Sequence, residues 1–142
     1  MAYWLFSKKN SMKNLEIIIL AAGKGTRMKS SKPKILHELG GKQIIDYVID
    51  ASIRLKPKRI HLVVNNQIKN NFKNYNNLNI VIQKKQNGTG DAIKSAIKSL
   101  EKDSVTLVLY GDVPLIKYKT ILNVSKIKTN IINLLCFNKE ER

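Results

Sequence analysis

The sequence contains a single cysteine, Cys136, which excludes an internal disulfide and any cysteine-rich metal site. Its neighbours Leu135 and Phe137 are apolar, so we expect a thiol that is buried in a strand. No apolar run approaches the roughly 18 to 20 residues needed to cross a bilayer. The first residues also lack the leading positive charge and the length of a secretory signal. We therefore expect a cytoplasmic protein without a membrane span.

Acidic residues are scarce, because 10 aspartates and glutamates stand against 26 lysines and arginines, which gives a formal net charge of +16. A charge of this size often indicates nucleic-acid binding. Arginine, the residue best suited to base edges and phosphates, is rare here, and the lysines are spread along the chain. We therefore expect no specific nucleic-acid partner, but a general attraction to polyanions, nucleotides included.

The 142 residues suffice for one domain with a core, but not for two. Within this length, short apolar runs alternate with amphipathic stretches. We expect strands at 16–20, 59–64, 79–82, 104–109 and 130–137, and helices near 44–54, 67–75, 92–100 and 117–126. This alternation predicts an α/β protein with a parallel sheet that helices cover on both faces. Residues 1–14 are expected to form a loose extension, and residues 15–142 a partial domain.

The loop after the first expected strand, 21–36, combines small residues with fixed positive charges. Its alanines, Gly23 and Gly25 allow backbone N–H groups to approach an anion closely. Arg27 and Lys34 can neutralise the charge held there. The spacing matches neither the P-loop nor the dinucleotide-binding fingerprint. The loop therefore predicts a polyphosphate site of another type, and a flexible turn with solvated lysines is the alternative.

A second loop follows the third expected strand. Parallel sheets bind ligands outside the carboxyl ends of their strands, which is where this loop falls. Gly88 and Gly90 flank Thr89 just before a helix, so free N–H groups face the ligand region. The amide of Gln83 can donate to and accept from the edge of a base. A simple turn is the alternative, and Asp91 is the expected N-cap of the helix.

A carboxylate follows the fourth expected strand directly. Asp112, next to Gly111, is well placed to hold Mg²⁺ against nucleotide phosphates. Alternatively, Asp112 caps a helix that begins near Pro114. His37 and His61 lie far apart without partners at metal-ligand spacing, and we expect both to be structural.

Four motifs together closely resemble the uridylyltransferase domain of the bacterial bifunctional enzyme that makes UDP-N-acetylglucosamine. They are Leu-Ala-Ala-Gly-Lys-Gly-Thr-Arg-Met, Lys-Pro-Lys-Ile-Leu-His, Gln-x-x-Gln-x-Gly-Thr-Gly and Leu-Tyr-Gly-Asp-Val-Pro-Leu-Ile. The match runs in register from about Leu15 to Phe137. The resemblance implies a Rossmann-like three-layer fold of the nucleotide-diphospho-sugar transferase type, incomplete at its C-terminus.

The resemblance also assigns nucleotide contacts to the matching residues. These are Leu20, Ala21, Ala22, Gly23, Gly25, Lys34, Gln83, Gly88, Thr89, Tyr110 and Gly111. Among them, Gln83, Gly88 and Thr89 would recognise uracil and its ribose. Tyr110 and Gly111 would lie near the sugar of the nucleotide.

In the resembling family, the phosphate of N-acetylglucosamine-1-phosphate attacks the α-phosphorus of UTP and expels pyrophosphate, which supplies a peptidoglycan precursor. Lys34 and Arg27 would be the catalytic residues, and Asp112 would bind the Mg²⁺ cofactor. Such a transfer needs positioning, metal and fixed positive charge rather than a strong base. The absence of a catalytic histidine or cysteine is therefore consistent with this reaction.

The sequence also departs from the family pattern. Asp91 stands where a histidine is common, and Gln43 replaces the usual proline. The residues that hold the acceptor sugar, the second metal contact and the trimerising acetyltransferase half are not found in this sequence. We therefore expect weak or no turnover by this chain alone, unless a complementing C-terminal chain supplies the rest. The alternative is a non-enzymatic nucleotide-binding fragment.

Overall fold

A five-stranded sheet forms the centre of the computed structural model, which describes residues 3–5, 14–23, 25, 28 and 30–125. Its strands are β1 (Tyr3–Leu5), β2 (Leu15–Leu20), β5 (Arg59–Val64), β6 (Leu78–Ile82) and β7 (Val105–Tyr110). The strand order is β1-β7-β2-β5-β6, and the four longer strands are parallel to one another. The predicted parallel α/β sheet is therefore confirmed.

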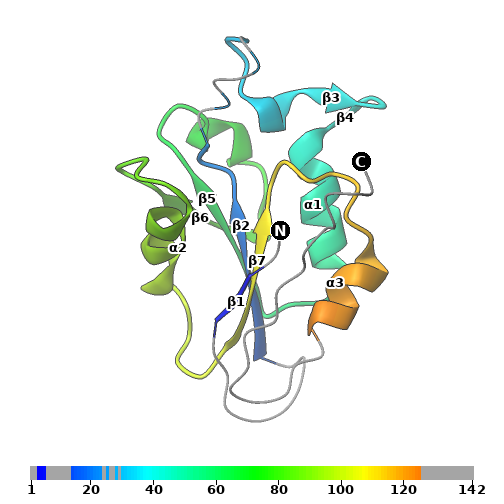
Figure 1. Cartoon of the computed structure of the whole chain (residues 1–142), viewed down its shortest axis with the longest axis vertical. Coiled ribbons are helices and arrows are strands. Elements are labelled where there is room, and N and C mark those ends of the chain that lie inside the picture. Colours follow the sequence, from blue (N-terminus) through cyan, green and yellow to red (C-terminus); the bar gives the residue numbers. More distant parts are fainter. Residues whose placement is uncertain (1–2, 6–13, 24, 26–27, 29, 126–142) are drawn as a thin grey trace, which may run out of the picture.

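Helices cover both faces of this sheet (Figure 1). They are α1 (Ile44–Ile53), α2 (Thr89–Ile97) and α3 (Tyr118–Ser125). Helix α2 lies on one face, whereas α1 and α3 lie on the other, which gives three layers (Figure 1). A hairpin of β3 (Glu38–Leu39) and β4 (Lys42–Gln43) leads into α1. None of the helices in the described part of the chain has the length and apolar character needed to cross a bilayer.

The apolar core has two halves, one on each face of the sheet. Successive side chains of a strand point to opposite faces, so a strand covered on both sides is largely apolar. In β2, Ile17 and Ile19 pack in the cluster that contains residues of α1 and α3. Ile18 and Leu20 pack with the buried alanines of α2 in the other cluster. This burial holds the carboxyl end of β2 rigidly at the centre of the sheet.

Two of the expected helices differ from the prediction. Helix α2 begins at Thr89 with Gly88 as its N-cap, so the expectation that Asp91 is the N-cap is wrong. Residues 67–75 form only a short 3₁₀ turn, Lys69–Phe72. The asparagine-rich composition explains this, because asparagine is a poor helix former. The Oδ1 of Asn65 also accepts hydrogen bonds from the N–H groups of Gln67 and Ile68, which favours a turn there.

Within 1–14, where we expected a loose extension, the short strand β1 pairs antiparallel with β7. The expected strand 130–137, with Cys136, lies outside the described residues. The division into residues 1–14 and 15–142 stays a prediction.

Candidate functional site

A cavity of about 620 Å³ lies at the carboxyl ends of the parallel strands. The loop after β2, the start of α2 and the end of β7 form its walls. All the residues expected to contact the nucleotide line this cavity except Gly111, and Asp112 joins them. Arg27, the other expected catalytic residue, lies outside the described residues. The structure thus brings together three segments that are far apart in the sequence.

Backbone hydrogen bonds fix the start of the first loop to both neighbouring strands. The N–H of Ala21 donates to the carbonyl of Val63 at 2.8 Å. The carbonyl of Leu20 accepts from the N–H of Gly111 at 2.9 Å. Further along, Gly25 has a φ of 59°, a left-handed conformation that favours glycine. The start of this loop is therefore held between the two neighbouring strands at the wall of the cavity.

Gly111 contributes to the site through close packing. A Cβ on Gly111 would lie 2.6 Å from the Cδ1 of Ile45 and 3.1 Å from the carbonyl oxygen of Leu20. A side chain on Gly111 would therefore force Ile45 or the end of β7 to shift. Its two neighbours, Tyr110 and Asp112, both line the cavity.

Lys34 and Asp112 form an ion pair at the wall of the cavity, with the Nζ 2.8 Å from the Oδ2. Lys34 begins a short 3₁₀ turn, Lys34–Leu36, which the buried side chains of Ile35 and Leu36 anchor in the core. The two side chains are 41% and 40% exposed, so solvent and ligands can reach both charges. Such an exposed pair contributes little to stability. Either group can therefore leave the pair for a ligand at a small cost in free energy.

The residues present fit a divalent cation only in part. Among the described residues, no group of three or more histidine, cysteine, aspartate or glutamate side chains could hold a metal ion. Mg²⁺ commonly binds through one or two carboxylates, several waters and the phosphates of a nucleotide. The carboxylate of Asp112, at the wall of the cavity, fits that mode of binding.

Two glutamines close the side of the cavity near α2. The Nε2 of Gln83 donates to the Oδ2 of Asp91 at 2.9 Å and to the carbonyl of Gly88 at 3.3 Å. The Nε2 of Gln86 donates to the carbonyl of Ala22 at 2.7 Å, which ties this loop to the first one. Gln86 also lines the cavity, but sequence reasoning did not assign it a role. Its position as the second glutamine of the Gln-x-x-Gln motif could have indicated a role in the site.

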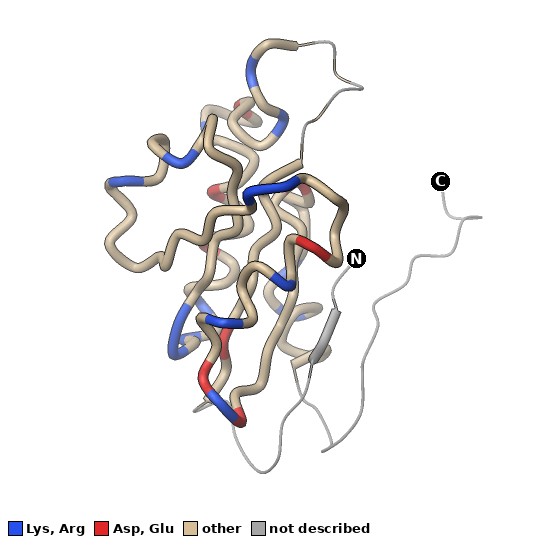
Figure 2. Tube along the Cα trace, turned by 90° about the vertical axis from the view of Figure 1, so that its left-hand side faces the viewer, with Lys and Arg blue, Asp and Glu red and all other residues tan. Residues whose placement is uncertain are grey.

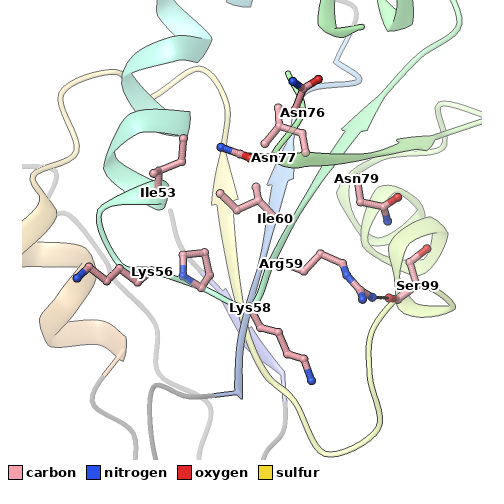
Figure 3. A pocket seen from close by; sticks show the side chains of 11 residues that line it. Ile53, Lys56, Lys58, Arg59, Ile60, Asn76, Asn77, Asn79 and Ser99 are labelled. Atoms are coloured by element: carbon pink, nitrogen blue, oxygen red, sulfur yellow. Dashed lines mark hydrogen bonds between the residues drawn. The ribbon is translucent and has the colours of Figure 1, made fainter. Parts of the chain in front are cut away.

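A second hollow, of about 770 Å³, lies at the opposite end of the sheet near the starts of β5 and β6 (Figure 3). Lys58 and Arg59, which line it, both pair with Glu101, and Arg59 also donates to the carbonyl of Ser99 (Figure 3). None of the residues selected for nucleotide chemistry lines this hollow. Lysines and arginines occur at both ends of the fold rather than along one strip (Figure 2). The cavity at the carboxyl ends is therefore the candidate site.

The parallel sheet and the glycine-rich loops at its carboxyl edge define an α/β domain of the nucleotide-binding class. Comparison with known families makes this more specific. The chain belongs to the family of MobA-like NTP transferase domains, whose characteristic pattern matches residues 17–127.

Curated relatives agree with this family. The "Bifunctional protein GlmU" of Buchnera aphidicola subsp. Acyrthosiphon pisum is 52% identical over 114 residues, which cover 79% of this chain and 25% of that protein. The "Bifunctional protein GlmU" of Pseudomonas aeruginosa is 46% identical over 110 residues, 76% of this chain and 24% of that protein. The resemblance to the bifunctional enzyme is therefore confirmed. The chain spans about a quarter of the length of these relatives.

Solved structures share the fold at low identity. Rv0371c from Mycobacterium tuberculosis superposes with a TM-score of 0.69 at 14% identity, over 81% of this chain and 60% of that one. The 4-diphosphocytidyl-2C-methyl-D-erythritol synthase of Anaerococcus prevotii superposes with a TM-score of 0.64 at 22% identity. The superposition covers 79% of this chain and 49% of that one. Rv0371c was also solved in a complex with manganese. That structure superposes with a TM-score of 0.65 at 14% identity, over 79% of this chain and 58% of that one. The fold is thus that of the nucleotidyltransferases.

Proposed function

We propose that the cavity at the carboxyl ends of the strands binds UTP for uridylyl transfer to N-acetylglucosamine-1-phosphate. The observation that carries this proposal is the Lys34–Asp112 ion pair, with its 2.8 Å separation at the cavity wall. It places a fixed cation and a carboxylate together, which a metal–triphosphate complex requires. The identity to GlmU proteins supports uracil as the base and the sugar phosphate as the acceptor.

These positions suit the proposed reaction. An oxygen of the sugar phosphate attacks the α-phosphorus of UTP, the bond to the bridging oxygen of the β-phosphate breaks, and pyrophosphate leaves. Lys34 leaves Asp112 for the phosphates and neutralises the negative charge that grows during transfer. Mg²⁺, when bound through Asp112, would offset further charge on the triphosphate. Arg27 is proposed to assist Lys34 at the same phosphates.

Calorimetric titration with UTP, CTP and GTP, with and without Mg²⁺, tests the binding. We expect UTP to bind best and Mg²⁺ to strengthen it. Lys34→Ala should weaken UTP binding about tenfold, since it removes one charged hydrogen bond. Lys98→Ala removes an equal charge from an exposed site just after α2 and should leave the affinity unchanged. Equal weak binding of all three nucleotides would overturn the proposal.

Pyrophosphate release separates an enzyme from a binding module. We expect little release from UTP and the sugar phosphate by this chain alone, and more after addition of a chain that carries the acceptor site. Binding without release in either mixture would favour the non-enzymatic alternative. The cytoplasmic location stays a prediction of the sequence.

A further inference from the structure

The carboxylate of Asp91 accepts a hydrogen bond from a buried amide, that of Gln83, at the wall of the cavity. Gln83 is 4% exposed, and its backbone N–H donates to the carbonyl of Val64 at 2.8 Å, which extends the sheet beyond β6. Its Nε2 is 2.9 Å from the Oδ2 of Asp91 and 3.3 Å from the carbonyl oxygen of Gly88. Gln83 is thus held both at its backbone and at the end of its side chain.

The chemistry of these partners determines which way the amide faces. A carboxylate and a backbone carbonyl only accept hydrogen bonds, so the group that faces them must be the NH₂ of Gln83. Both donor hydrogens of that NH₂ are then used. The remaining polar atom, the Oε1, accepts no hydrogen bond from any residue within the described ranges. A buried oxygen of this kind calls for a donor, and the cavity that Gln83 lines can supply one with a bound ligand.

The backbone of Asp91 is itself held in place. It lies in the first turn of the nine-residue helix α2, whose dipole stabilises a negative charge at that end. The hydroxyl of Ser95 donates to the carbonyl of Asp91 at 2.9 Å, within the same helix. The left-handed φ of Gly88, 99°, turns its carbonyl into the helix, where it also accepts from the N–H of Ala92 at 3.2 Å. The two acceptors that hold Gln83 therefore belong to one rigid element.

We propose that Asp91 is a positioning residue that makes the site select uracil over cytosine, an inference that rests on the proposed binding of UTP. By fixing the NH₂ of Gln83, Asp91 leaves the Oε1 to face the base. Uracil presents an N3–H donor to that oxygen, whereas cytosine presents a bare N3, so two acceptors would oppose each other. Discrimination therefore includes a repulsive contact against the wrong base.

The test compares UTP and CTP dissociation constants of the wild-type chain with those of Asp91→Ala. The variant leaves only the longer bond to Gly88, so the amide can rotate and accept cytosine. We expect the preference for UTP to fall about tenfold, mainly through tighter CTP binding. Asp91→Asn keeps an acceptor oxygen and should recover most of the preference. Asp103→Asn, at an exposed position with a φ of 68° that asparagine tolerates, removes the same charge elsewhere and should change nothing.

The outcomes separate this inference from the function on which it rests. If the wild-type chain prefers UTP and Asp91→Ala keeps that preference within twofold, the role of Asp91 is overturned and the proposed function stands. If the wild-type chain itself shows no preference for UTP over CTP, both proposals are overturned. A preference that falls in Asp91→Ala and returns in Asp91→Asn supports both.

Discussion

The imidazole of His61 lies 3.1 Å from the carboxylate of Glu16, and neither side chain is exposed to solvent. On the other side of the ring, the Nδ2 of Asn79 lies 2.9 Å from the Nδ1 of His61. If Asn79 donates there, the ring proton sits on the Nε2 and donates to Glu16. The backbone N–H of Glu101 gives Glu16 a further donor at 3.3 Å. This buried chain joins β2, β5 and β6, far from the candidate site, and agrees with a structural role for His61.

Stability should therefore depend on pH near neutrality. Burial lowers the pKa of His61 below its ordinary value, although the hydrogen bond that the ring donates to Glu16 opposes this shift. Below the ordinary histidine pKa of about 6.5, the unfolded chain takes up a proton that the folded chain resists. The stability is thus fully present above that pKa and is lost as the pH falls toward the lower, folded value. Urea unfolding at a series of pH values between 8 and 5 should show this loss.

The second histidine is the control for that measurement. His37 is half-buried, and within the described residues the one hydrogen bond of its side chain goes to the carbonyl of Lys32, at 3.0 Å. A His37→Ala variant should keep the loss of stability on acidification. A pH profile that becomes flat in this variant would mean that the slope comes from His37 and not from His61.

Removal of the His61 side chain should be costly. His61→Ala leaves the Glu16 carboxylate buried without its side-chain partner, so we expect the free energy of unfolding to fall by about 3 to 5 kcal/mol. His37→Ala should cost less than about 1 kcal/mol, since its one bond is at the surface. Chemical denaturation measures both. Equal losses in the two variants would contradict a special role for the buried pair.

A side chain at Gly111 should destabilise the fold, because Ile45 and Leu20 fill the space beside it. In Gly111→Ala the new Cβ would meet the Cδ1 of Ile45 at 2.6 Å and the fixed carbonyl of Leu20 at 3.1 Å. We expect a loss of about 1 to 3 kcal/mol, typical of an overpacked core, in thermal or denaturant unfolding. Gly90→Ala is the matched control, because a Cβ there has no atom within 4 Å and lies in the first turn of α2. That variant should be neutral or slightly stabilising; a comparable loss would refute the packing argument.

Asp112 should matter for metal-dependent binding more than for folding. In Asp112→Asn the ion pair with Lys34 is lost, but both side chains are about 40% exposed, so unfolding should change by less than about 1 kcal/mol. The strengthening of UTP binding by Mg²⁺ should disappear in the variant, because a neutral amide is a poor ligand for that ion. Titrations with and without Mg²⁺ measure the effect. Asp112→Asn that keeps the full Mg²⁺ dependence would place the metal elsewhere.

The four parallel strands and the three loops at their carboxyl edge were predictable from the sequence, since these strands are mostly apolar and three of them lead into loops with glycine or charged residues. Leu20, Gln83 and Asp112 could be assigned to one edge for that reason alone. The orientation of the Gln83 amide could not be predicted, because the sequence indicated that Asp91 is the N-cap of the helix. In the structure α2 begins at Thr89, so the Asp91 side chain is available to Gln83. The buried Glu16–His61 pair was hidden too, since strand periodicity reveals that a residue is buried but not what it faces across the sheet.

A crystal structure of the chain with UTP and Mg²⁺ tests the central claim most directly. We expect the triphosphate in the cavity of about 620 Å³, with the Nζ of Lys34 on a phosphate oxygen. We also expect an Asp112 carboxylate oxygen about 2.1 Å from the ion. A nucleotide bound at the opposite end of the sheet, or an Asp112 side chain turned away from the ion, would contradict the proposed site.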